Sequence, residues 1–322
     1  MLMTRSVISI FSAVMMVLGA SAACAQGYPT KPIRIVTASP GGGADRVARK
    51  ISDWISGPLG GQSIIIENHG GVTRSIDIVA RALPDGYTLL VAGSTLWTLP
   101  LLTSEPLWDP VKDFSPITFA TTTPSILVVT PSLPVKSVKD LIALAKAKPG
   151  VLNYSASVVG SASHLGVEKF KSMAGVNIVG VNYKGNGPAA VAVASGDVQM
   201  TIGGTSTVNA WQAGKVRALA ISSAQRSPLF PELPTVSESG VPGFEASAVN
   251  VVMAPARTPA AIITRLNQEI VRFLSDPAVK RGFLDDGGQL VVPTTPEEFA
   301  AIIKSEMVIL SKVIKDAGIK TQ

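Results

Sequence analysis

The chain has 322 residues, with one cysteine, two histidines and a formal net charge of +6. A single cysteine excludes an internal disulfide and a cluster of thiolate metal ligands. Only 5% of the residues are aromatic, and the basic residues are scattered, which argues against a nucleic-acid surface, because such a surface needs a basic stripe with stacking aromatic side chains. A chain of roughly 300 residues buries enough surface to fold without disulfides, and this length suggests two domains.

The first 25 residues are typical of a secretory signal peptide. Arg5 supplies the positive charge at the start, and residues 7–18 form a mostly apolar stretch that is too short for a membrane span of ~20 residues. Small residues at positions 20–25 then predict cleavage before Gln26. We therefore expect a periplasmic protein, secreted through a cleaved signal peptide.

The only cysteine lies inside this predicted cleavage site. Ala23 and Ala25 flank Cys24, so cleavage after Ala25 leaves a mature chain without cysteine. Lipidation of Cys24 is the alternative, although Ser21 stands where a lipobox has leucine.

The mature chain opens with an apolar strand at residues 33–37, a glycine-rich loop, and a helix that begins near Asp45. The loop reads Ala-Ser-Pro-Gly-Gly-Gly-Ala over residues 38–44. A helix N-terminus has unpaired N–H groups and a partial positive charge, and glycines let a ligand approach the backbone. The spacing matches neither a dinucleotide fingerprint nor a P-loop. The loop therefore indicates either a site for a small anion or a tight turn without a ligand.

The rest of the chain alternates short β-rich runs with helical patterns, which predicts an α/β fold with two mostly parallel sheets. Expected strands are 33–37, 64–67, 87–91, 126–130, 151–154, 178–181, 200–202, 218–221, 249–254 and 289–292, and expected helices are 45–55, 76–83, 138–147, 164–173, 189–194, 259–274, 278–284 and 296–317.

Two of the apolar strands, at 125–130 and 246–254, are flanked by prolines and are typical of crossings between two domains. They predict a discontinuous first lobe, residues 26–124 and 248–322, and a second lobe, residues 125–247. Such a layout suits a cleft that closes on a ligand by hinge motion.

A set of short stretches runs along the whole mature chain, among them Tyr-Pro-Thr-Lys-Pro-Ile-Arg-Ile-Val at 28–36 and Pro-Asp-Gly-Tyr-Thr-Leu-Leu at 84–90. The others are 40–42 with Asp45 and 48–49, 67–68, 112–114, 141–150, 152–154, 163–165, 170–173, 183–185, 214–220, 234–236, 240–243 and 317–320. Together, in this order, they resemble one family, the periplasmic solute-binding receptors of tripartite tricarboxylate transporters, or Bug proteins.

The resemblance implies a two-lobed periplasmic binding protein fold of the Venus flytrap type, with a small carboxylate bound in the cleft between the lobes. It further implies a monomer that needs no cofactor or metal, performs no catalysis and delivers its ligand to membrane permease subunits. This implication agrees with the anion site indicated by the glycine loop.

In the first lobe, the resemblance places a ligand carboxylate on the backbone N–H groups of the glycine loop. The candidate residues there are Ser39, Gly41, Gly42 and Gly43, with Asp45 either as the helix N-cap or as a ligand contact.

The second loop of this lobe, which follows the strand at 64–67, contributes Thr73 and Arg74. Arg74 stands where the family usually has an uncharged residue. It is either a solvated loop arginine or a clamp on a second carboxylate.

In the second lobe, the candidates lie in two predicted strand-to-helix loops and at the end of the strand at 200–202: Ser161, Ser163, His164, Tyr183, Lys184, Asn186 and Gly203. Ser161 and Ser163 can cap a helix or contact a ligand, and we expect His164 to hold its loop through a ring hydrogen bond. Lys184 is a charge partner or a solvated lysine. Relatives commonly have Asp-Asn where this chain has Gly203 and Gly204, and the missing acid argues against an amino-acid ligand.

Two other functions compete with the transport receptor. One is a ligand-sensing binding protein that feeds a two-component sensor, which the sequence does not separate from transport. The other is a secreted hydrolase, but the chain has two histidines and no Gly-x-Ser-x-Gly motif. Ser161 and His164 lie three residues apart at a helix start, which suits capping better than catalysis.

Overall fold

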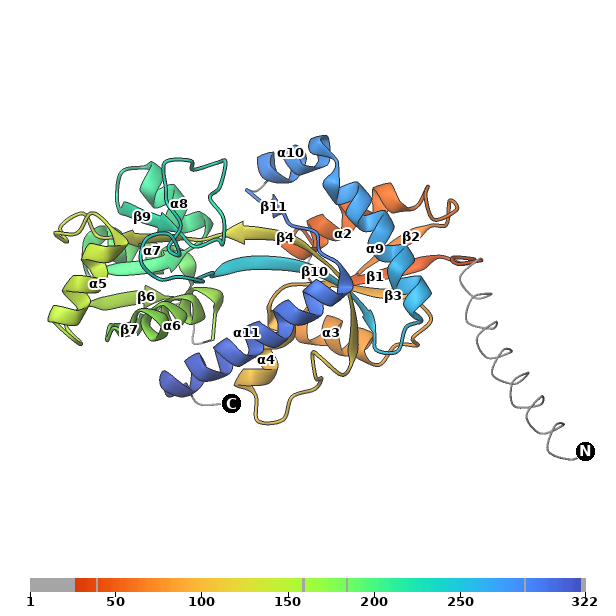
Figure 1. Ribbon diagram of the computed structural model, residues 1–322, viewed down its shortest axis with the longest axis horizontal. Coiled ribbons are helices and arrows are strands. Elements are labelled where there is room, and N and C mark those ends of the chain that lie inside the picture. The colour runs from red at the N-terminus through yellow and green to blue at the C-terminus, as the bar shows by residue number, and fades with distance from the viewer. Residues whose placement is uncertain (1–26, 39, 158–159, 184, 287, 320–322) are drawn as a thin grey trace, which may run out of the picture.

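The computed structural model describes residues 27–38, 40–157, 160–183, 185–286 and 288–319. The chain forms two β-sheets, each covered by helices, and two long strands pass between the two halves (Figure 1). This confirms the predicted α/β fold. The expected cleavage site at residue 26 lies outside the described residues.

The first sheet has six strands in the order β11-β4-β10-β3-β1-β2. Its strands are β1 (Ile33–Thr37), β2 (Ile64–Asn68), β3 (Thr88–Ala92), β4 (Phe114–Pro124), β10 (Ser247–Pro255) and β11 (Leu290–Val291). Its helices are α2 (Gly43–Ile55), α3 (Val72–Ala80), α4 (Thr95–Leu102), α9 (Ala260–Ser275), α10 (Pro277–Asp285) and α11 (Pro296–Asp316).

The second sheet has five strands in the order β7-β6-β8-β5-β9. Its strands are β5 (Ile126–Val129), β6 (Asn153–Ala156), β7 (Val179–Asn182), β8 (Met200–Gly203) and β9 (Arg217–Ile221). Its helices are α5 (Val138–Ala147), α6 (Ala162–Ala174), α7 (Asn186–Ser195) and α8 (Thr205–Gln212).

Both sheets are mixed, so the expectation of mostly parallel sheets is corrected. Only β1, β2 and β3 in the first sheet and β6, β7 and β8 in the second pair in parallel. β10 is antiparallel to β3 and β4, and β5 is antiparallel to β8 and β9. The reason is the crossing itself, because a strand that arrives from the other half enters against the direction of the strand–helix units.

Each sheet has an apolar core on both faces. In the first half, Ile51 of α2 and Leu266 of α9 pack on one face, and Phe299 and Ile303 of α11 pack on the other. All four side chains are 2% exposed or less. Burying such side chains contributes about 1.5–3 kcal/mol each, so each half holds its sheet rigidly behind the loops at its edge.

Helix α11 links the two halves a third time. Its N-terminus carries a capping box made by Thr295 and Glu298, and the helix then runs from the first sheet toward α6 (Figure 1). There Lys169 donates to Glu306 Oε1 at 2.9 Å and Ser172 donates to Asp316 Oδ2 at 3.3 Å. The C-terminal half of α11 is therefore attached to the second half of the molecule. Among the described residues, no helix is both long and apolar enough to cross a membrane.

Candidate ligand site

Three helices begin at one edge of the first sheet. β1, β2 and β3 are parallel, and they lead directly into α2, α3 and α4. The N-cap positions are Gly42, Gly71 and Ser94, and none of them makes a side-chain cap hydrogen bond with a described residue. β10 arrives from the other half and pairs with β3 near Ala92, at the end of β3. This edge therefore faces the second sheet.

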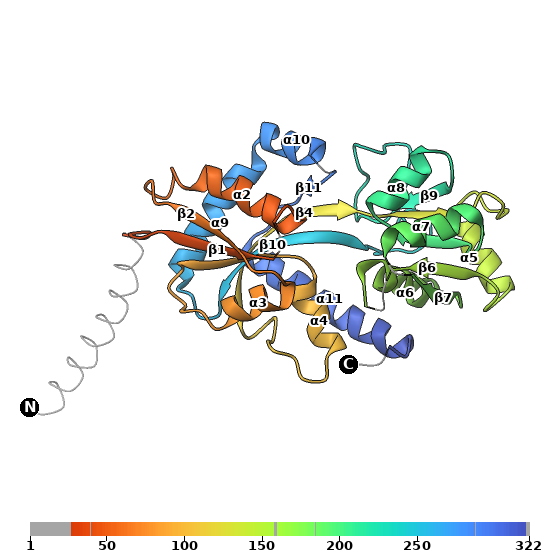
Figure 2. The same cartoon turned by 180° about the vertical axis from the view of Figure 1, so that it is seen from behind.

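In the second sheet, too, three helices begin at the edge where the parallel strands end. β6, β7 and β8 are parallel and lead into α6, α7 and α8. β5, which arrives from the first half, starts beside the end of β8, where Ile126 pairs with Gly203. The two groups of helices lie on either side of β4 and β10 (Figure 2). Six helix N-termini thus point toward the space between the halves.

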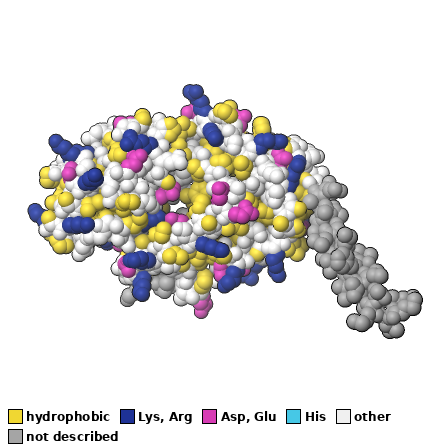
Figure 3. All heavy atoms as spheres, in the orientation of Figure 1, with side chains coloured by type: hydrophobic (Ala, Val, Ile, Leu, Met, Phe, Trp, Pro, Cys, Tyr) yellow, Lys and Arg dark blue, Asp and Glu magenta, His cyan; other side chains and the backbone are white. Residues whose placement is uncertain are grey.

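These two edges carry the candidate residues. Gly41, Gly42, Gly43, Thr73 and Arg74 lie at the first edge, and Ser161, Ser163, His164, Tyr183, Asn186 and Gly203 lie at the second. Ser39 and Lys184 lie outside the described residues. Within the described part of the chain, no three His, Cys, Asp or Glu side chains come together as a possible metal site. Basic side chains are scattered over the face in Figure 3.

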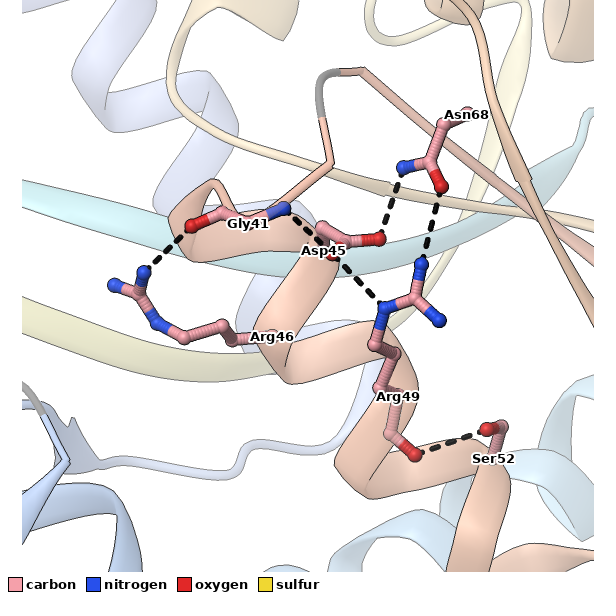
Figure 4. A network of polar contacts seen from close by, with 6 residues as sticks. All are labelled: Gly41, Asp45, Arg46, Arg49, Ser52 and Asn68. Carbon is pink, nitrogen blue, oxygen red and sulfur yellow. Dashed lines mark hydrogen bonds and ion pairs between the residues drawn. The ribbon is translucent and has the colours of Figure 1, made fainter.

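The glycine loop is held by a buried carboxylate. Asp45 is 2% exposed and accepts hydrogen bonds from the Gly41 N–H at 2.8 Å, Arg49 Nε at 3.0 Å and Asn68 Nδ2 at 2.9 Å (Figure 4). Gly42, not Asp45, is the N-cap, so the N-cap interpretation of Asp45 is wrong. Asp45 instead reaches back from the first turn to fix Gly41, whose φ of +74° favours glycine.

This network sets the charge of Asp45. Burial by itself would raise its pKa, but the hydrogen bonds from Arg49, Asn68 and Gly41 outweigh burial and lower the pKa from 3.8 to about 2. The carboxylate therefore stabilises the folded state above pH 4, and this contribution is lost as the pH falls toward 2.

We expect Asp45→Asn to remove on the order of 2 kcal/mol from the free energy of unfolding at pH 6, and little at pH 2, because the wild-type carboxylate is then half protonated. Urea unfolding at both pH values measures this difference. Asp53→Asn, an exposed position on the same helix, is the matched control. Equal pH dependence of stability in wild type and Asp45→Asn would contradict the assignment.

The start of α3 is tied to β1 by Ser75, whose hydroxyl donates to the carbonyl of Thr37 at 3.0 Å. Thr73 and Arg74 lie in the first turn of α3 and are exposed. Among the described residues, no side-chain hydrogen bond or ion pair engages Arg74. A cation at a helix N-terminus gains nothing from the helix dipole, so the charge of Arg74 is available to an anion at this edge.

Two buried amides next to the glycine loop are absent from the sequence-based candidates. A Cβ atom on Gly43 would lie 3.5 Å from Asn250 Oδ1 and 3.7 Å from Gln289 Nε2. Asn250 is 7% exposed and Gln289 5%, and Asn250 donates to Thr121 Oγ1 at 3.0 Å. Asn250 is the one polar residue within the apolar run 249–254, which is the signal that could have identified it.

In the second half, the loop before α6 is built from hydroxyls and one imidazole. Ser161 caps α6 by accepting from the His164 N–H, and Ser163 accepts from the Ser157 N–H at 3.1 Å. His164 Nδ1 accepts from the Gly160 N–H at 3.1 Å, which confirms the predicted ring hydrogen bond. Burial lowers the pKa of His164, although Glu168 opposes this shift, and the lower pKa favours the neutral ring that accepts this hydrogen bond.

The loops before α7 and α8 place the remaining candidates of the second half. The Tyr183 N–H donates to the carbonyls of Ala156 and Ser157, and the Tyr183 ring packs against an apolar cluster. Asn186 is exposed at the first position of α7. At Gly203, a Cβ atom would lie 2.1 Å from Thr207 Oγ1, so no side chain fits there unless Thr207 moves.

Known proteins are similar in sequence to this chain over most of its length. Residues 47–319 match TctC, the tripartite tricarboxylate transporter family receptor. The chain is 36% identical over 327 residues to protein BugT of Bordetella pertussis, with 99% of each chain covered. It is 34% identical over 312 residues to a UPF0065 protein of Bordetella bronchiseptica, covering 95% of this chain and 92% of the relative.

Solved structures of similar sequence have the same two-lobed fold. R. palustris Rpa4515 with adipate is 35% identical, with a TM-score of 0.68 and coverage of 90% of this chain and 98% of that one. MatC from Rhodopseudomonas palustris with bound malate is 31% identical, with a TM-score of 0.65 and coverage of 89% and 100%. These similarities confirm the predicted fold and set aside the hydrolase. The chain belongs to the tripartite tricarboxylate transporter receptor family.

Proposed function

We propose that this receptor captures a small dicarboxylate without an amino group in the space between its two lobes. The observation that carries the proposal is the convergence of six helix N-termini on that space. Helix N-termini bind carboxylates through free N–H groups and a partial positive charge. The solved relatives with adipate and with malate support a dicarboxylate as the ligand class.

The second half supports the exclusion of amino acids. An ammonium group is held best by a carboxylate, and the family resemblance implies an aspartate where this chain has Gly203. Thr207 occupies the position that a side chain at Gly203 would need. The described starts of α6, α7 and α8 therefore offer a ligand hydroxyls and N–H groups.

Calorimetry on the purified mature protein tests this function. We expect succinate-like acids to bind more tightly than aspartate or glutamate, and a ligand at 100 times its Kd to add about 2.7 kcal/mol to the free energy of unfolding. Tighter binding of aspartate or glutamate would contradict the inference from Gly203. The absence of binding by every carboxylate would contradict the function.

We propose that the lobes comprise residues 26–124 with 248–322, and residues 125–247. Strand β4 of the first sheet ends at Pro124, and strand β5 of the second sheet begins at Ile126. The chain re-enters the first sheet with β10, which begins at Ser247.

We further propose that the receptor is a monomer and passes its ligand to membrane permease subunits.

We also propose export to the periplasm with cleavage before Gln26. Mass spectrometry of the periplasmic form should show a chain that lacks residues 1–25 and carries no lipid. A membrane-bound species acylated at Cys24 would overturn this prediction.

A further inference from the structure

A cavity of about 260 Å³ lies between the lobes, and its lining includes Ser161 of the candidate ligand site. Ser94 and Thr95 at the start of α4 line it from one lobe, and Gly160 and Ser161 at the start of α6 line it from the other. The lobes touch at its rim, because a Cβ atom on Gly160 would lie 2.8 Å from Leu102 Cδ1. A molecule in this cavity therefore contacts both lobes at once.

The lining is mainly apolar. Side chains from α4, α6, β4 and α11 make up the hydrocarbon wall: Trp97, Leu102, Phe119, Leu165, Ile302 and Leu310. Its polar part contains the charged side chains of Lys169, Glu245 and Glu306 and hydroxyls at the two helix starts. It also contains Ser247, whose Oγ is buried without a hydrogen-bond partner in the described structure. A buried hydroxyl without a partner is costly, and a bound polar group next to the helix starts would satisfy it.

The charges around the cavity decide which part of a ligand fits. Lys169 is 3% exposed and donates to Glu306 Oε1 at 2.9 Å, so its charge is already neutralised. Glu245 also lines the cavity, where burial and the neighbouring Glu306 raise the pKa of its carboxyl. In its ionised form it would repel a second carboxylate. The interior therefore favours hydrocarbon over a second carboxylate, and the carboxylates belong at the helix starts.

We infer that this cavity receives an apolar substituent of the ligand, so that the receptor prefers carboxylates with a hydrocarbon branch over small polar acids. This inference rests on the proposed function. A substituent in the cavity touches both lobes, so the free energy of its burial favours the closed arrangement over an open one. Each methylene buried should tighten binding about fourfold, equivalent to about 0.8 kcal/mol.

The test uses succinate, methylsuccinate and benzylsuccinate, which share both carboxylates and differ only in hydrocarbon. We expect calorimetry to show benzylsuccinate binding at least tenfold more tightly than succinate to the wild type. Ala162→Leu places a larger side chain in the cavity from an exposed position in the first turn of α6. It should reduce that ratio to threefold or less, because it displaces the hydrocarbon branch.

Ala261→Leu is the matched control, because Ala261 is also an exposed helical alanine but lies outside this cavity. Thr98→Leu fills the cavity from the opposite wall and replaces Ala162→Leu if thermal unfolding shows that the latter does not fold. Equal affinity of the three acids for wild type, or an equal loss for succinate and benzylsuccinate in the filled variants, overturns this inference alone. Failure of all three acids to bind overturns the proposed function and this inference together.

Discussion

Gly42→Val should reduce the affinity for a carboxylate by about a hundredfold or more while leaving the fold intact. Gly42 is the N-cap of α2, with φ −68° and ψ 168°, a conformation that valine adopts readily. The first N–H groups of α2 have no partner within the helix, and a branched side chain at the N-cap prevents a carboxylate from reaching them. Losing two charge-assisted hydrogen bonds of about 1.5 kcal/mol each accounts for the expected loss.

Calorimetry measures this loss, and Gly57→Val is its matched control. Gly57 is exposed just beyond the other end of α2, and a Cβ atom there meets no neighbour within 4 Å. The control should bind as the wild type does, and both variants should have the thermal unfolding midpoint of the wild type within a few degrees. Unchanged affinity in a folded Gly42→Val protein would mean that the anion is held elsewhere.

Arg74→Ala should weaken a dicarboxylate by about 2 to 3 kcal/mol and a monocarboxylate much less. Arg74 is exposed in the first turn of α3, at the edge that faces the second lobe. A guanidinium binds a carboxylate through two parallel hydrogen bonds, and truncating one partner of such a pair leaves the other poorly solvated. The measurement is the ratio of the affinities for succinate and propionate.

The control for this second prediction is Arg81→Ala. Arg81 is also exposed and follows the last residue of α3, where it pairs with Asp77 at 2.7 Å. Its removal should not change the ratio. If Arg74→Ala weakens both acids equally, Arg74 acts through the general field of the protein and not as a clamp on the second carboxylate.

Elements with a clear periodic pattern could be predicted from the sequence, whereas those without one could not. The expected helix at 296–317 agrees with α11, because a long apolar stripe and a capping box both mark it. β4, α4 and α8 were not predicted. β4 contains Pro116 and a run of threonines, and α4 is apolar on all sides and contains Pro100, so neither shows the expected alternation or stripe. The structure of β4 comes from its pairing with β10, and that of α4 comes from packing against α11.

The sequence could predict which loops carry the candidate site, but it could not predict which residues contact one another there. The glycine loop before α2 and the serines before α6 mark helix starts in the sequence, and parallel pairing brings such starts to one edge of each sheet. The sequence could not show that Asn250 lies against Gly43, because the two residues are 207 positions apart. It also could not show that Thr207 fills the space at Gly203, or that Asp45 reaches back to Gly41.

The attachment of α11 to α6 determines which distances report lobe motion. α11 is rooted in the first core through Phe299 and Ile303 but holds Lys169 and Ser172 of the second lobe through Glu306 and Asp316. Its C-terminal turns should therefore travel with α6 whenever the lobes rotate. A fluorophore pair on α11 and α6 would stay at constant separation, whereas a pair on α2 and α7, on opposite sides of the ligand space, would follow each capture event.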